Sequence, residues 1–287
     1  MTGGPRVVAL GGGHGLAATL RAVRQYGGDV TAIVSVADDG GSSGRLREIF
    51  GVPPPGDLRK CLVALSTPSV WSTAFEHRFD AGELEGHALG NLVIAGLAAS
   101  TGDFLFAVEE AGRLVDAGGT VLPATTVPVV LKADAAGGAV QGQVAVGQSE
   151  RIVKVSLVPP DPSPPAAALT ALARADQIVL GPGSLYTSVL AVVAVPALRE
   201  ALAAAEGRKV YVCNLRPQVP ETEGYDVAAH LAALESHGVE VDVVLCDTSG
   251  VRLGAPSQPW VEAPLARPNG LAHDSDKLAA ALADLVG

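Results

Sequence analysis

Two stretches of this sequence share one order: a short apolar run, a glycine-rich turn and a segment with helical spacing. They begin at Arg6 and at Gln177. Similar apolar, β-branched runs, typical of buried strands, alternate with helical spacing in both halves of the chain. This alternation predicts an α/β protein with a mostly parallel, doubly wound sheet. The predicted strands are 6–10, 30–37, 177–180, 209–213 and 239–245.

The segment 37–47, after the second predicted strand, combines two carboxylates, three glycines, two hydroxyls and two arginines. Glycines let backbone amides approach a ligand, and arginines pair with phosphate oxygens. Carboxylates in the same loop can hold a divalent cation or a sugar hydroxyl. The segment therefore predicts a loop that binds a phosphorylated small molecule, and the alternative is a well-capped turn with solvated charges. Its candidate residues are Asp38, Asp39, Gly40, Gly41, Ser42, Ser43 and Arg45.

The first glycine-rich turn, Gly12-Gly13-His14-Gly15, lies between a strand and a predicted helix at 16–26. Such a junction can bind an anion because the first amides of a helix lack partners. Neither G-x-G-x-x-G nor the Walker pattern is present, so this turn does not by itself predict a dinucleotide or a nucleoside triphosphate. The turn after the second such strand, with Gly183, Ser184 and Thr187, is suited to a second phosphate or a sugar.

Four further positions carry polar groups that are candidates for the same site. Asp57 is a predicted N-cap, and Arg59 in the following turn would oppose the helix dipole unless an anion or solvent compensates it. His87 and Asn91 are four residues apart and share a face if a helix has begun there. A histidine beside glycine is more often a cap or a core hydrogen bonder than a catalytic group, and no second ligand at zinc spacing accompanies it.

Residues 120–158 differ from the rest, because short predicted strands there are separated by Gly, Asp and Ser turns. We expect a small β-rich excursion within a single domain that spans 1–287. The predicted strands of this region include 127–131, 140–146 and 152–157.

The composition excludes several classes of partner. The net charge of −10 and an aromatic content of 4% argue against nucleic acid. The three cysteines are far apart and form no C-x-x-C, which fits a reducing cytoplasm. No signal peptide precedes Arg6, and no apolar run reaches the roughly 20 residues of a membrane span.

The sequence resembles the YvcK/CofD-like family, and within it the YvcK branch of gluconeogenesis factors. The resemblance covers nearly the whole chain, and its most specific strings are 36–47 and 181–188. The other matching segments are 11–15, 54–62, 87–92, 211–214 and 221–225.

This resemblance implies a Rossmann-like fold with a nucleotide-type pocket at the strand ends. It also implies a cytoplasmic protein that binds UDP-sugars such as UDP-N-acetylglucosamine and acts in cell shape and in growth on gluconeogenic carbon sources. No cofactor is required, and a homo-oligomer is compatible with the family. The residues then expected to bind the ligand are Gly12, Gly13, His14, Gly15, Asp38, Asp39, Gly40, Gly41, Ser42, Ser43, Arg45, Asp57, Arg59, His87, Asn91, Gly183, Ser184, Thr187 and Asn214.

A second branch of the family, the 2-phospho-L-lactate transferases, implies an alternative. In that reading Asp38 or Asp39 holds Mg²⁺, and Arg45 and Arg59 neutralise a leaving diphosphate. A third class, a protein that acts only through partner contacts, also stays open. Two positions depart from the family pattern: His14 stands where the family usually has Thr, and Ala272 where it usually has Arg.

Overall fold

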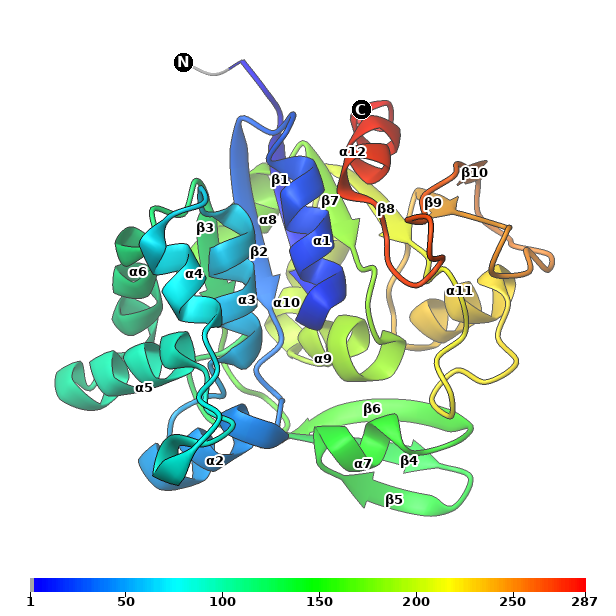
Figure 1. Cartoon of the computed structure of the whole chain (residues 1–287). Helices are drawn as coiled ribbons and strands as arrows, with labels where there is room; N and C mark the ends of the chain where they lie inside the picture. The colour runs from blue at the N-terminus through cyan, green and yellow to red at the C-terminus, as the bar shows by residue number, and fades with distance from the viewer. Residues whose placement is uncertain (1–2) are drawn as a thin grey trace.

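Seven parallel strands form one twisted sheet in the computed structural model of the chain, which describes residues 3–287 (Figure 1). Their order is β10-β9-β8-β7-β1-β2-β3, so the chain builds outward from β1 in one direction and from β7 in the other. This confirms the doubly wound, Rossmann-like α/β fold. Met1 and Thr2, at the start of the segment considered for a signal peptide, lie outside the described residues. The strands are β1 (Arg6–Gly11), β2 (Asp29–Val34), β3 (Thr120–Pro123), β7 (Gln177–Leu180), β8 (Arg208–Val212), β9 (Val243–Cys246) and β10 (Trp260–Glu262).

β1 lies at the centre of the topology, because it pairs with β2 on one side and with β7 on the other. Leu10 is in register with Ile33 of β2 and with Leu180 of β7. The strand order reverses between β1 and β7, and in sheets of this kind ligands bind at that point, outside the carboxyl ends. All three residues are fully buried, since helices cover both faces of the sheet.

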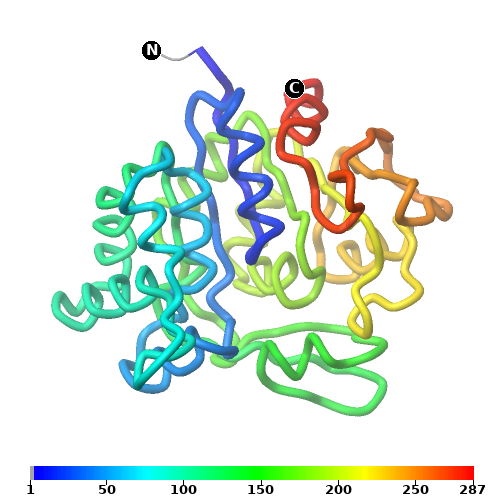
Figure 2. The backbone as a smooth tube through the Cα atoms, in the orientation of Figure 1, coloured from blue at the N-terminus to red at the C-terminus, as the bar shows by residue number. Residues whose placement is uncertain are grey.

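Two helical layers enclose the sheet (Figure 1). α1 packs between α3 and α12 on one face, and α8 packs against α10 on the other. Figure 2 shows the resulting contact between the two ends of the chain, since the C-terminal helix lies beside α1. These helices are α1 (Gly13–Val23), α3 (Gly56–Leu65), α8 (Ala166–Arg174), α10 (Pro196–Ala204) and α12 (Ser275–Ala283).

The remaining helices lie at the edges of the sheet and around its carboxyl ends (Figure 1). They include a π-helical turn, Leu185–Val189, directly before α9, and a 3₁₀ turn, Gly82–Leu84. The helices are α2 (Gly41–Phe50), α4 (Val70–Glu76), α5 (Leu89–Thr101), α6 (Phe104–Leu114), α7 (Gln143–Gly147), α9 (Leu190–Val193) and α11 (Val227–Ser236).

The structure corrects the expected loop at 38–47. Only Asp38–Gly40 is a loop, because α2 begins at Gly41 and ends at the left-handed Gly51. Gly44 allows this helix to start so early, since a Cβ there would lie 2.1 Å from the Asp39 carbonyl oxygen. Ser42 and Ser43 are consequently buried in the first turn of α2 and do not extend from a loop.

The β-rich excursion is smaller than expected. Thr120–Pro123 is β3, the edge strand of the main sheet, and a separate three-stranded antiparallel sheet of order β5-β4-β6 follows it. Part of the strand expected at 140–146 is the short helix α7. The strands of the small sheet are β4 (Val130–Ala135), β5 (Gly138–Gln141) and β6 (Ile152–Val158).

Among residues 3–287, no single helix is long and apolar enough to cross a membrane. Two consecutive helical segments, Leu185–Val193 and Pro196–Ala204, would be long and apolar enough only if they were counted as one, and the chain bends by 79° between them. Leu185–Val193 is buried throughout.

Two glycines of α5 give a matched test of the packing described here. A Cβ on Gly90 would lie 2.6 Å from Cδ1 of the buried Phe75, whereas a Cβ on Gly96 would meet no atom within 4 Å. We expect Gly90→Ala to lower the free energy of unfolding by about 1–3 kcal/mol through overpacking. Gly96→Ala should leave it unchanged or raise it by up to about 1 kcal/mol. Urea denaturation of both variants decides this, and equal stability would contradict the packing of α5 on α4.

Candidate functional site

The start of α1 and the turn after β7 are in direct contact. A Cβ on Gly15 would lie 2.2 Å from the carbonyl oxygen of Pro182, so only glycine fits this position without a shift. The hydroxyl of Thr19, one turn further along α1, donates a hydrogen bond of 2.7 Å to the carbonyl of Gly181. The two predicted strand–glycine–helix junctions therefore meet at the point where the strand order reverses.

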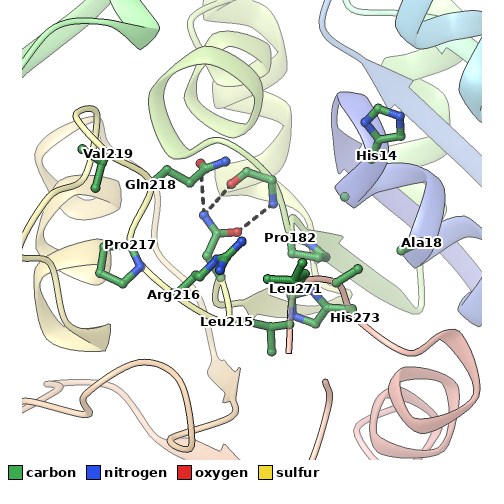
Figure 3. A pocket seen from close by; sticks show the side chains of 14 residues that line it. His14, Ala18, Pro182, Leu215, Arg216, Pro217, Gln218, Val219, Leu271 and His273 are labelled. Atoms are coloured by element: carbon green, nitrogen blue, oxygen red, sulfur yellow. Dashed lines mark hydrogen bonds between the residues drawn. The ribbon is translucent and has the colours of Figure 1, made fainter. Parts of the chain in front are cut away.

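A cavity of about 690 Å³ opens at this point, beside the carboxyl ends of β1, β7 and β8 (Figure 3). This volume lies within the range of small-molecule sites, about 300–1,000 Å³. His14 and Ala18 of α1 lie on one side of it, and the segment after β8 lies on the other, with Pro182 between them (Figure 3). Four of the predicted ligand-binding residues line it: His14, Gly15, Gly183 and Asn214.

The first turn of α1 offers unpaired amides to this cavity. The Gly13 amide donates 2.8 Å to Oδ2 of Asp57, and the Leu16 amide bonds to the Gly12 carbonyl. Within residues 3–287, the amides of His14 and Gly15 are therefore the ones that the helix start leaves without a partner. They lie at the positive end of the helix dipole, where an anion is stabilised. Asp57 is thus not the N-cap of α3, which begins at Gly56; instead it caps α1.

Asn214 fixes the second glycine turn. Its Oδ1 accepts a hydrogen bond of 3.0 Å from the Gly183 amide, and its Nδ2 donates one of 2.9 Å to the Gly183 carbonyl (Figure 3). Both ends of the side-chain amide are thereby bonded to Gly183, and Nδ2 also donates a long hydrogen bond of 3.4 Å to Oε1 of Gln218. Asn214 shapes the cavity wall and leaves little of its own hydrogen-bonding capacity for a ligand.

The carboxylate of Glu221, which was not among the predicted site residues, accepts hydrogen bonds at the helix start after this turn. It accepts from the amides of Tyr186 (2.9 Å) and Thr187 (3.0 Å) and from the hydroxyl of Ser184. Glu221 is 3% exposed, and this burial raises the pKa of its carboxyl. Ser184 and Thr187 therefore surround an internal carboxylate at the position where a second phosphate or a sugar was expected. A glutamate alone in a polar loop gave no local signal for this role.

A second polar cluster lies beyond the end of β2, and it joins several other predicted residues. Ser42 Oγ lies 3.0 Å from Nδ1 of His87 and accepts from Nδ2 of Asn91 at 3.1 Å. Nε of Arg59 donates 3.1 Å to Oδ1 of Asn91, and its Nη1 pairs with Glu76. Ser42, Arg59, His87 and Asn91 are buried and form one chain of contacts, whereas Glu76 at the end of α4 is exposed.

Asp38 and Asp39 lie beside this cluster but engage different neighbours. Oδ1 of Asp38 accepts from the Gly40 amide at 2.9 Å, and burial raises the pKa of this carboxyl. Oδ1 of Asp39 accepts from the Val144 amide of α7 at 3.0 Å. Arg45 donates 2.7 Å to the Glu85 carbonyl. No residue of 38–47 lines the cavity. The residues predicted to bind one ligand therefore fall into two groups, one at the cavity and one beyond the end of β2.

Asp57 links the start of α1 to α3. One oxygen caps α1 through Gly13, and the other accepts from Lys60 Nζ at 2.9 Å. The same lysine, together with burial, lowers the pKa of His14 at the cavity rim. The ends of β1 and β2 are also adjacent, since the Ser35 amide donates 2.8 Å to the Gly11 carbonyl.

Residues 7–276 match the family model described as 2-phospho-L-lactate transferase CofD. The chain belongs to the CofD family. It is 44% identical over 246 residues to the gluconeogenesis factor of Halalkalibacterium halodurans, covering 83% of this chain and 76% of that protein. It is also 44% identical over 237 residues to the gluconeogenesis factor of Bacillus subtilis, covering 81% of this chain and 75% of that one.

A crystal structure of a UPF0052 family member from Bacillus halodurans has the same fold. Its TM-score is 0.91 at 37% identity, with 97% of this chain and 98% of that chain covered. Within this CofD-family chain, both positions that depart from the expected family pattern, His14 and Ala272, line the cavity.

His273, beside Ala272 in the cavity wall, is buried and has one ring nitrogen, Nε2, without a partner among the described residues. Burial lowers its pKa to about 4, while a hydrogen bond to the Cys213 backbone acts in the opposite direction. The His273 ring is therefore neutral near pH 7. An exposed histidine, with a pKa of about 6.5, is partly protonated at that pH.

This shift predicts an acid-dependent loss of stability. Below about pH 6.5 the unfolded chain binds a proton at His273, whereas the folded chain does not until about pH 4, so protonation favours unfolding in this window. We expect wild type to lose about 3 kcal/mol more than His273→Gln between pH 6.5 and pH 4. Urea denaturation of both proteins at several pH values measures this difference. The other histidines are present in both proteins, so their contributions to the pH dependence cancel. Parallel curves for the two proteins would refute the assignment.

Proposed function

We propose that this chain binds a nucleotide-linked sugar of the UDP-N-acetylglucosamine type in the cavity beside α1, and acts as a regulator. The observation that carries the proposal is the pair of backbone amides of His14 and Gly15, which have no hydrogen-bond partner among residues 3–287 and belong to residues that line a cavity of about 690 Å³. A phosphate at this helix start would gain charge-assisted hydrogen bonds. Gly15, Gly183 and the segment after β8 line the rest of the cavity, where the base and the sugar of the nucleotide would lie.

The regulatory part of the proposal rests on the relatives named gluconeogenesis factors and on the family resemblance. We extend it to a cytoplasmic role in cell shape and in growth on gluconeogenic carbon sources. No cofactor enters this proposal, because binding at a helix start needs none.

Isothermal titration with UDP-N-acetylglucosamine tests the proposal. We expect binding by wild type and roughly tenfold weaker binding by Asn214→Ala, because Gly183 then loses both of its hydrogen bonds to the side chain. Arg45→Ala serves as the comparison, since Arg45 lies outside the cavity lining; its affinity should match wild type if the ligand stays in the cavity. If no heat of binding were detected with any UDP-linked or GDP-linked sugar, the proposal would be refuted.

A transferase is the second candidate, and the description of the matching family model favours it. In this reading the half-buried Asp38, which lies within the electrostatic reach of Asp57 and Lys60, contributes to a Mg²⁺ site near the transferred phosphoryl group. Incubation with a nucleotide-activated phospholactate, a deazaflavin acceptor and Mg²⁺ distinguishes the two functions. Formation of the phospholactyl product would favour the transferase, and a lack of product with intact UDP-sugar binding would favour the regulator.

A further inference from the structure

Arg216 lines the cavity, and its guanidinium forms no ion pair with a carboxylate of residues 3–287. It follows β8 by four residues, is exposed, and makes no side-chain hydrogen bond or ion pair within residues 3–287. Figure 3 shows it across the cavity from His14. Neither structural contacts nor packing therefore account for a guanidinium at this place.

The segment that carries Arg216 is held firmly on both sides. Asn214 is bonded twice to Gly183, and the Gln218 amide donates 2.8 Å to the Thr222 hydroxyl while the Thr222 amide donates 2.7 Å to the Gln218 carbonyl. Glu221 then anchors the following residues to the helix start at Tyr186. A fixed backbone reduces the entropy that a ligand must remove when it orders the arginine.

The charge around the cavity also points to an anion. The chain carries 30 acidic and 20 basic residues, yet among the described residues, 3–287, no Asp or Glu belongs to the cavity lining. The lining instead presents the dipole of α1 on one side and Arg216 on the other. A guanidinium matches the geometry of phosphate oxygens bidentately, which a point charge does not.

We propose that Arg216 binds the diphosphate of the ligand from the wall opposite α1 and so makes the cavity specific for diphosphate compounds over uncharged nucleosides. The assignment rests on the proposed function, because it places a nucleoside diphosphate in the same cavity. It adds the residue that selects the charged part of that ligand.

The experiment compares wild type, Arg216→Ala, Arg216→Lys and Arg174→Ala by isothermal titration with UDP-N-acetylglucosamine, uridine and inorganic pyrophosphate. Arg174 is an exposed arginine at the end of α8, outside the cavity lining, so its loss controls for net charge. We expect Arg216→Ala to weaken the two diphosphate compounds roughly tenfold and to leave uridine unchanged. Arg216→Lys should lie in between, and Arg174→Ala should match wild type.

The outcomes separate this inference from the proposed function. Pyrophosphate binding that depends on Arg216, without any binding of the UDP-sugar, would refute the nucleotide-sugar ligand and retain the anion-binding role. Diphosphate affinities equal in wild type and Arg216→Ala, or an equal loss for uridine, would overturn the role of Arg216. Absence of binding by wild type to all three compounds would overturn both proposals.

Discussion

The close approach of Gly15 to the Pro182 carbonyl is the constraint on which the site depends. Two main chains can meet at this distance only because the first of them lacks a Cβ. The parallel pairing of β1 with β7 brings both turns to the same edge, and the bond from Thr19 to Gly181 holds them together. The cavity beside α1 follows from this contact, since the segment after β8 closes its far wall.

Internal carboxylates decide which helix starts remain available to a ligand. Asp57 takes the Gly13 amide, and Glu221 takes the amides of Tyr186 and Thr187 together with the Ser184 hydroxyl. Buried donors need partners, and at these positions the protein's own carboxylates supply them. A glycine-rich turn before a helix therefore indicates a place where an anion fits, and does not say whether that anion belongs to a ligand.

The sequence predicted the fold because its signals are local. Alternation of apolar runs and helical segments is sufficient for a parallel doubly wound sheet, and the glycine turns mark its carboxyl edge. The roles of Asp57 and Glu221 were not predictable in this way, since their partners lie 44 and 34 or more residues away. The early start of α2 likewise depends on the contact of Gly44 with Asp39, and its glycines and serines are more typical of a loop.

The difference between the two clusters explains why the cavity, and not the segment at 38–47, is the better place for a ligand. The groups around Ser42, His87, Asn91 and Arg59 already satisfy one another in a buried chain of hydrogen bonds. A ligand there would have to break these bonds before it gained any of its own, and a buried group left unpaired costs about 1–3 kcal/mol. In the cavity, the amides of His14 and Gly15 and the Arg216 guanidinium have no such partners to lose within the part of the chain that the structure describes. An anion that enters replaces only water, so the net gain in hydrogen bonding is largest where the protein has left its donors unused.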